Sequence, residues 1–256
     1  MSSARNPALR RLLAGVVALA GLAGAQPALA QAVVVRSTGP SMATYPQGKK
    51  LPANAKVTLK TGDRLTVLDK AGTRVLSGPG SFTLDSTVAR DQTTASRVSG
   101  VLAAGGGARP RTGAVRGVPR PAAALPPPSP DSVWYIDVSR GGAYCIVGTE
   151  TPVLWRPNRT EQAMGKLSDG RGKTVDVIWK AGNPLKQWPA QLPLVDGASY
   201  RFADPVGPTI TIVTHLIGAL ASDELAVAGT LADKGCMAQL DVLANAAGEP
   251  GPAGVR

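Results

Sequence analysis

A segment of 36 residues with almost no capacity to fold divides this chain. It runs from Ala95 to Pro130 and reads ASRVSGVLAAGGGARPRTGAVRGVPRPAAALPPPSP. The segment consists mainly of Gly, Pro, Ala and Arg, lacks aromatic residues and shows no apolar periodicity, so it cannot bury enough surface to fold. Its Pro-rich end is typical of a stiff, extended polyproline II linker. We therefore predict a disordered linker over 87–130.

The segments on either side of the linker are long enough for separate domains. We predict a small domain over 32–86, a larger one over 131–246, and a flexible tail over 247–256. The overall expectation is a mainly β protein of two domains. It combines a small β module with a β-sandwich or barrel-like domain that ends in a helical pair.

The N-terminus has the pattern of a cleavable signal peptide over residues 1–30. Three arginines within the first eleven residues precede an apolar run of 14 residues, Leu12–Ala25. Ala28-Leu29-Ala30 then matches a signal-peptidase site, which predicts a mature start near Gln31 and a periplasmic location. The alternative is an uncleaved anchor, but the run is shorter than the roughly 17 to 25 residues that span a bilayer. No later stretch is long and apolar enough to span, so we predict no transmembrane segment in the mature chain.

The net charge of +11 is unevenly distributed. Counting Lys and Arg against Asp and Glu gives +5 for residues 31–86, +5 for 87–130 and −2 for 131–256. An exported protein meets no genome, so nucleic acid is not an expected partner. The linker arginines could attract an anionic cell-wall or membrane surface through their field. The alternative is a solvated linker whose arginines contact nothing specific.

Short strands are predicted throughout the first domain. The stretch Gly62–Phe82 contains several glycines and could be read as a phosphate-binding loop, but no helix follows to direct its amide groups at an anion. Instead, Gly72 supplies the positive φ of a hairpin loop, and Gly78-Pro79-Gly80 turns the chain again. Strands are expected at 33–37, 55–60, 63–69, 73–77 and 81–85.

The order of these motifs resembles a FecR-type periplasmic β domain. The pattern is Gly-Asp-x-Leu-Thr-x-Leu-Asp, a turn, Gly-Thr-x-x-Leu and then Gly-Pro-x-x-Phe, and the resemblance covers about Ala53–Leu84. It implies a small non-catalytic module for binding or signal relay in the cell envelope.

The second domain combines strands with a C-terminal helical pair. Six apolar runs separated by Gly, Pro and Asp turns predict strands at sandwich or barrel spacing. Helical spacing then begins after Ser222, which could cap the first helix. Gly235 could end that helix and Cys236 could open the next, with Leu240 and Leu243 buried. We expect the pair to close one edge or face of the β domain and to protect its sheet from edge pairing.

Cys145 and Cys236 are the only two cysteines. In an oxidising compartment they are predicted to form a disulfide, which would close a loop of about 90 residues and stabilise the fold by roughly 4 kcal/mol. The alternatives are two buried free thiols, or a reactive thiolate at Cys236, because a helix N-terminus lowers a thiol pKa.

Other residues with catalytic or ligand-binding chemistry show no assembled signature. His215 is the only histidine, lies among apolar neighbours and lacks metal-ligand spacing, so we predict no metal site and no cofactor. Gly172-Lys173-Thr174 lacks the first glycine of a phosphate loop and reads as a hairpin. A carboxylate pair such as Asp137 and Asp176 would meet only in space. We therefore predict that the protein is not an enzyme.

Tryptophan offers the one candidate ligand surface. Trp155, Arg156 and Trp188 lie next to prolines at strand ends, where a ring could stack on a sugar. The alternative places these rings in the core of a domain that has a single Phe, Phe202.

We predict an exported binding or signal-relay protein that contacts an envelope protein partner. The alternatives are a glycan or peptidoglycan binder that uses exposed Trp residues, and a periplasmic hydrolase.

Overall fold

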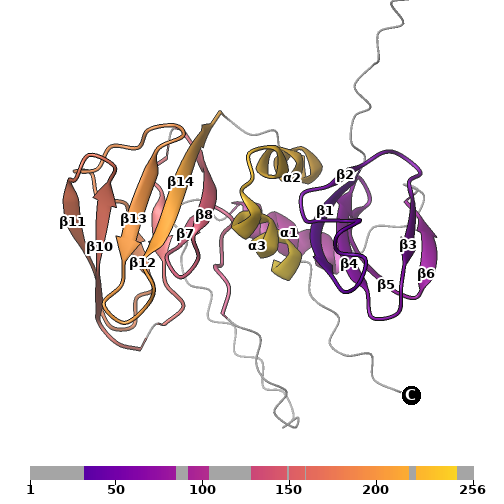
Figure 1. Ribbon diagram of the computed structural model, residues 1–256, viewed down its shortest axis with the longest axis horizontal. Coiled ribbons are helices and arrows are strands. Elements are labelled where there is room, and N and C mark those ends of the chain that lie inside the picture. Colours follow the sequence, from indigo (N-terminus) through magenta and orange to yellow (C-terminus); the bar gives the residue numbers. More distant parts are fainter. Residues whose placement is uncertain are drawn as a thin grey trace, which may run out of the picture.

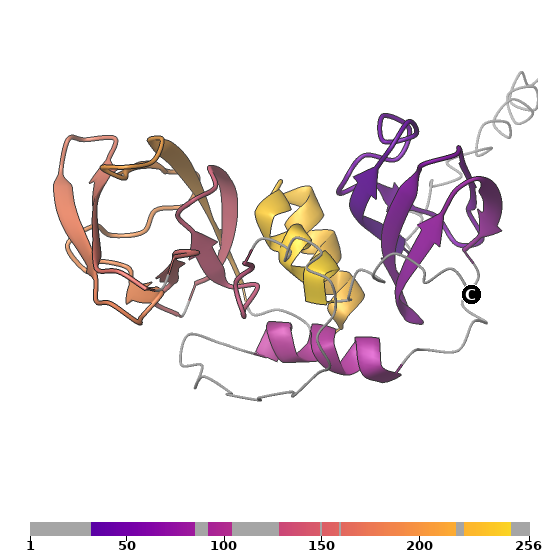
Figure 2. The same cartoon turned by 90° about the horizontal axis from the view of Figure 1, so that it is seen from below.

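The computed structural model describes residues 32–84, 92–103, 128–148, 150–158, 160–218 and 223–246. These residues form a mainly β fold, in which two β-units lie on opposite sides of a layer of helices (Figures 1 and 2). The expected signal peptide over 1–30, the tail over 247–256 and most of the expected linker lie outside the described residues.

The first β-unit pairs a four-stranded antiparallel sheet with a two-stranded ribbon. The sheet order is β2-β1-β4-β5, and the ribbon is β3-β6. β4 and β5 form the predicted hairpin, with Asp69 opposite Gly72 and Gly72 at a φ of +113°. The six strands are β1 (Ala32–Thr38), β2 (Lys50–Leu51), β3 (Lys56–Leu59), β4 (Arg64–Asp69), β5 (Gly72–Ser77) and β6 (Gly80–Thr83).

β1 is buried on both faces, which explains its unbroken apolar run AVVV. Ala32 and Val34 face the core of the first unit, while Val33 and Val35 face the helices. Alternate side chains of a strand point to opposite faces of a sheet. A strand covered on both faces therefore needs apolar residues in succession.

The second β-unit consists of two sheets around one core. The larger sheet has the order β11-β10-β13-β14-β8 and the smaller one β12-β9-β7, and the pairs β14–β8 and β7–β9 are parallel. Within the described residues the strands do not close into a barrel. The eight strands are β7 (Tyr135–Asp137), β8 (Gly142–Val147), β9 (Val153–Trp155), β10 (Ala163–Asp169), β11 (Thr174–Trp179), β12 (Leu185–Gln187), β13 (Ser199–Ala203) and β14 (Ile210–Ile217).

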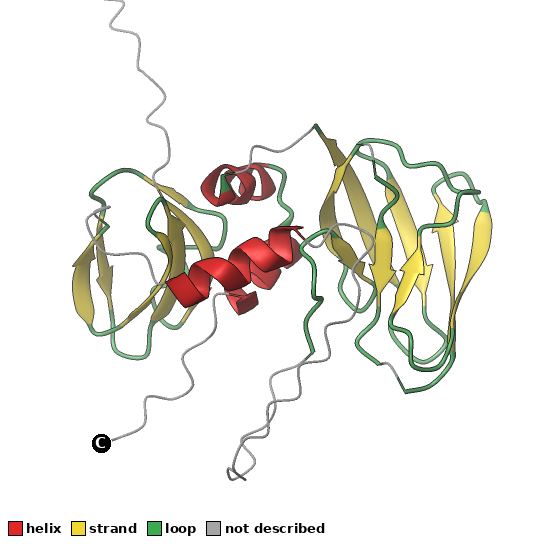
Figure 3. Cartoon of the chain, turned by 180° about the vertical axis from the view of Figure 1, so that it is seen from behind, coloured by secondary structure: helices red, strands yellow, loops and turns green. Residues whose placement is uncertain are grey.

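Three helices fill the space between the β-units (Figure 3). They are α1 (Gln92–Ala103), α2 (Glu224–Asp233) and α3 (Met237–Ala246). α2 begins at the N-cap Asp223, whose side chain accepts from the N–H of Leu225, one residue after the predicted cap. Gly235 adopts a φ of +71° directly after α2, and Leu240 and Leu243 are buried, as predicted.

The helical layer contributes to one core with both β-units. Val33 from β1 and Leu68 from β4 belong to the same buried cluster as Cys145 from β8 and Leu240 from α3. From the sequence, the helical pair was expected to pack on the second domain alone. In the structure the pair also covers the outer face of the first unit's sheet, because that face carries its own row of apolar side chains.

Four elements differ from the sequence-based expectation: α1, β10 and the short strands β2 and β12. α1 forms inside the segment expected to be a disordered linker, and its Val98 is buried in the shared core. Tertiary contacts thus stabilise a helix that composition alone did not indicate. β10 was not predicted, because Gly165 interrupts its apolar pattern. A Cβ at Gly165 would lie 2.3 Å from the ring of Phe202, so only glycine leaves room for that ring.

Candidate functional site

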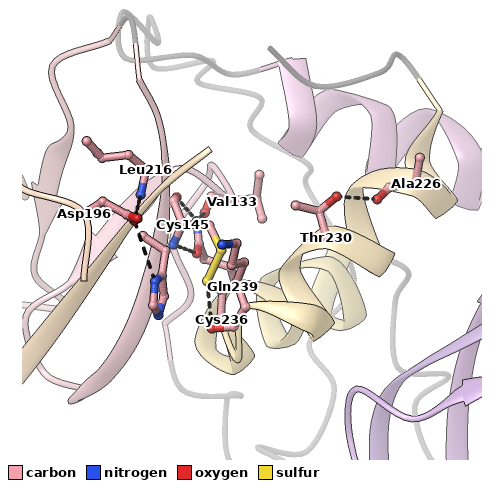
Figure 4. The surroundings of a disulfide bond; sticks show 10 residues. Val133, Cys145, Asp196, Leu216, Ala226, Thr230, Cys236 and Gln239 are labelled. Carbon is pink, nitrogen blue, oxygen red and sulfur yellow. Dashed lines mark hydrogen bonds and ion pairs between the residues drawn. A yellow bond between two sulfur atoms is a disulfide. The ribbon is translucent and has the colours of Figure 1, made fainter. Parts of the chain in front are cut away.

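The two cysteines form a disulfide where α3 meets the second β-unit. Cys145 lies in β8 and Cys236 directly precedes α3, 91 positions later in the sequence (Figure 4). Both side chains are buried in the shared core. The predicted disulfide is confirmed, and the alternatives of free thiols or a reactive Cys236 thiolate are wrong for this structure.

Gln239 reinforces the disulfide by binding the backbone of the same strand. Its Oε1 accepts from the N–H of Cys145 at 2.6 Å, and its Nε2 donates to the carbonyls of Cys145 at 2.9 Å and Val133 at 2.8 Å. β8 is the outer strand of the five-stranded sheet. The buried amide therefore replaces the hydrogen bonds that another strand would make at this edge, which blocks edge pairing.

Asp241 joins α3 to both β-units. Its carboxylate accepts from Arg36 of β1 at 3.4 Å and from Gln47 of the first unit at 2.9 Å. It also pairs with Arg140, in the turn before β8 of the second unit, at 2.6 Å. Gln47 additionally donates to the carbonyls of Val35 and Met237. One partly buried acidic side chain thus connects three separate parts of the fold.

α1 also contributes to this junction, through contacts with α2 and with the segment before β7. Ser99 donates a hydrogen bond to Glu224 at the start of α2. Trp134, just before β7, donates through its indole N–H to the carbonyl of Leu102 at 2.9 Å. The helical layer is therefore held by polar contacts as well as by apolar packing, which is the arrangement expected of a rigid connector.

The residues predicted to form an exposed ligand surface, Trp155, Arg156 and Trp188, are buried. Trp155 and Trp188 are only 1% and 4% exposed, and Arg156 is 6% exposed. Trp188 packs edge-on against Tyr200 and donates to the carbonyl of Leu192. The interpretation that these rings fill the core is confirmed, and their assignment as an exposed ligand surface is wrong. Prolines next to strand ends did not expose the rings. Trp155 packs with Tyr135, Val153 and Leu185 of the small sheet, and Trp188 is covered by Tyr200 and by the segment that follows it.

Arg156 has a structural explanation. Its guanidinium lies 6.0 Å from the ring centroid of Trp179 and donates to the carbonyls of Glu161 and Lys180. A planar guanidinium suits both contacts, since it stacks on a ring while donating in its own plane. Arg156 thus connects the loop before β10 with the loop after β11 through hydrogen bonds.

The other residues with catalytic potential are dispersed. His215 lies in β14 with its Nδ1 3.9 Å from the carboxylate of Asp196. Asp176 is exposed and pairs with Lys166 in the β10–β11 hairpin. Asp137 lies in the other sheet of this unit, so the two carboxylates considered for glycoside hydrolysis have separate surroundings.

Asp137 differs from His215 and Asp176 in being buried. Burial raises the pKa of its carboxyl, and this effect exceeds the opposing influence of the Ser139 hydrogen bonds and the Arg140 charge. Its backbone carbonyl accepts from the hydroxyl of Tyr144. These contacts order the β7–β8 turn that also places Arg140 beside Asp241.

Sequence reasoning missed Gln239 and Asp241. Gln239 could have been found as a polar residue on the side of a helix that also buries Leu240 and Leu243, because a buried amide needs partners. Asp241 gave no local signal. Its partners Arg36 and Arg140 lie 205 and 101 positions away in the sequence.

The rest of the described structure shows little that resembles a small-molecule site. Within the described ranges, no three His, Cys, Asp or Glu side chains are grouped so that they could hold a metal ion. None of the described helices combines the length and hydropathy needed to cross a bilayer. A shallow hollow of about 200 Å³ lies beside β10 and is lined by Met164, Gly165, Lys166, Ala203, Asp204 and Pro205.

Comparison of the chain with protein-family models, with curated proteins and with solved structures gave no match.

Proposed function

We propose that this chain is an exported, non-catalytic envelope protein that acts through protein–protein contacts. It would bind an envelope protein partner and transmit the effect of this binding from one β-unit to the other. The observation that carries the proposal is the junction at α3. A disulfide and Gln239 attach α3 to the second β-unit, while Asp241 and the shared core attach it to the first. A load or displacement at one unit would therefore be transmitted to the other.

Three features support the proposed location in the cell envelope and the proposed relay role. The pattern of residues 1–30 is that of an export signal. The buried Cys145–Cys236 bond is of a kind typical of proteins in oxidising compartments, which supports a periplasmic location. The FecR-like pattern over about Ala53–Leu84 adds the expectation of a non-catalytic relay module. An envelope protein is the partner class that fits these features.

The alternatives receive less support. Glycan binding by Trp155 and Trp188 would require exposed rings, and both are buried. A thiol hydrolase would require a free cysteine, and both cysteines are bonded. The linker arginines proposed to attract an anionic surface lie mostly outside the described residues.

Crosslinking in living cells, followed by affinity purification and mass spectrometry, tests the proposal. We expect one enriched envelope protein from the wild-type chain, and none from a control lacking residues 1–30. An Asp241→Ala variant should still bind the partner. The effect of partner binding at one β-unit should, however, no longer be transmitted to the other. Enrichment of wall fragments without a protein partner would contradict the proposal.

A further inference from the structure

The surface of the first β-unit carries positive charge that its own acids do not offset. Residues 31–86 contain eight Lys and Arg against three Asp, a net of +5. Two of these aspartates, Asp63 and Asp69, are buried and engaged internally. Asp63 accepts from the backbone N–H groups of Ser41 and Lys60, and Asp69 pairs with Arg74.

The helical layer offsets part of this charge, on one side only. Asp233 pairs with Lys50 at 2.6 Å, and Asp241 pairs with Arg36. Both contacts lie where the first unit meets the helices. The opposite end of the unit, formed by the ribbon β3–β6, is the part of the described fold farthest from the second β-unit (Figures 1 and 3).

The outer side of this ribbon presents ammonium and hydroxyl groups together. The strand alternation directs Lys56 and Thr58 outward, and exposed Lys60 continues the same alternation. On β6, Thr83 lies opposite Lys56 and Ser81 opposite Thr58. The hydroxyls of Thr58 and Ser81 are 3.0 Å apart.

A neighbouring loop extends this surface beside the edge of β3. The hydroxyl of Tyr45 accepts from the N–H of Thr58 at 3.1 Å. The ammonium of Lys49 lies 5.4 Å from the ring centroid of Tyr45, within cation–π range. The same ammonium donates to the carbonyl of Thr44 at 2.7 Å, so Lys49 stays with its own loop at the border of this surface. We call the outward surface of the ribbon the lysine–hydroxyl face, formed by Lys56, Thr58, Lys60, Ser81 and Thr83.

We propose that the lysine–hydroxyl face binds an anionic polysaccharide. Lysines at alternate strand positions attract sulfate, phosphate or carboxylate groups, and the hydroxyls between them can bond to sugar hydroxyls. From Lys56 to Lys60 the backbone spans about 13 Å at 3.3 Å per residue, which suits a linear polymer lying along the ribbon.

Charge and surface chemistry favour a glycan over a bilayer. The exposed side chains of β3 and β6 are all polar. Among the described residues of the first unit, Met42 in the loop between β1 and β2 is the one exposed large apolar side chain, and a single methionine gives little area for insertion among lipids. This inference does not depend on the proposed relay function, because it concerns a different surface and is tested without a protein partner.

Binding of the purified protein to heparin, a sulfated polysaccharide, tests the proposal. Affinity is measured between 50 and 300 mM salt for the wild type and for Lys56→Gln/Lys60→Gln. The matched control is Lys180→Gln/Lys186→Gln, which removes two exposed lysines from the second β-unit. Urea unfolding of all variants verifies that the substitutions leave the fold intact.

We expect the Lys56/Lys60 variant to bind heparin about tenfold more weakly. Its slope of log affinity against log salt should be reduced by about two, since two ionic contacts are lost. The control variant should remain within twofold of the wild type. A Thr58→Ala/Ser81→Ala variant, which keeps every charge, should bind about threefold more weakly.

Several results would overturn the proposal. One is equal weakening by the two lysine variants, which would indicate a long-range field without a defined face. Another is unchanged binding of the Thr58/Ser81 variant, which would remove the assignment to a sugar. Absence of heparin binding, or stronger binding to phosphatidylglycerol vesicles than to heparin, would also refute it.

Discussion

Replacing Gln239 by Met tests how much of the junction depends on one buried amide. Methionine has a similar length and helix propensity, so α3 and its apolar packing should be retained. The change removes three hydrogen bonds and leaves the N–H and carbonyl of Cys145 and the carbonyl of Val133 without that partner.

The expected loss of stability follows from these three groups. A hydrogen bond contributes about 1 kcal/mol net, and a buried group left without a partner costs about 1–3 kcal/mol. We therefore expect Gln239→Met to lower the free energy of unfolding by about 3 kcal/mol. At 2–4 °C per kcal/mol for a chain of this size, Tm should fall by roughly 6–12 °C.

Urea unfolding followed by tryptophan fluorescence measures the loss, and hydrogen exchange localises it. The amide of Cys145 should exchange faster in the variant, while amides of the β10–β11 hairpin should not change. Gln187→Met, at an exposed position of β12, is the matched control and should change stability by less than about 0.5 kcal/mol. A loss below about 1 kcal/mol for Gln239→Met, with unchanged exchange at Cys145, would refute the reasoning.

Three further predictions concern the same fold. Reduction of the Cys145–Cys236 bond, or the Cys145→Ala/Cys236→Ala variant, should lower stability by about 4 kcal/mol in the chain-entropy model; matching urea midpoints for oxidised and reduced protein would contradict this. Asp241→Ala should cost about 1–2 kcal/mol, because its ion pairs are partly exposed. It should also speed exchange in both β-units by hydrogen-exchange mass spectrometry, whereas an effect confined to α3 would contradict its joining role.

The third concerns pH. Burial alone would raise the pKa of Asp63, but hydrogen bonds from Ser41 and Lys60 outweigh it and hold that pKa below its ordinary value of 3.8. The folded state thus releases this proton more readily than the unfolded state, so the contribution is present above about pH 4 and disappears as pH falls through the folded pKa. Urea unfolding of wild type and Asp63→Asn between pH 2 and 6 should show a difference that shrinks on acidification; a constant difference would disprove it.

The amino-acid sequence by itself determined most of the strands, several turns and the cysteine pairing. Apolar runs and alternation located most strands of both units, and Gly72 and Gly235 were placed correctly because their turns need a positive φ. The disulfide was predicted from two cysteines in a chain whose first 30 residues resemble an export signal. These features depend on local backbone preferences or on chemistry that needs no knowledge of neighbours.

Only the tertiary structure decided what covers each apolar surface. A strand pattern shows which face is apolar, but not whether a helix, a sheet or solvent lies against it. The burial of Trp155 and Trp188, the formation of α1 and the position of the helical layer between the two β-units all depend on that choice. Asp241 and Gln239 acquire their roles from partners about 100 to 200 positions away, and no local pattern records contacts at that separation.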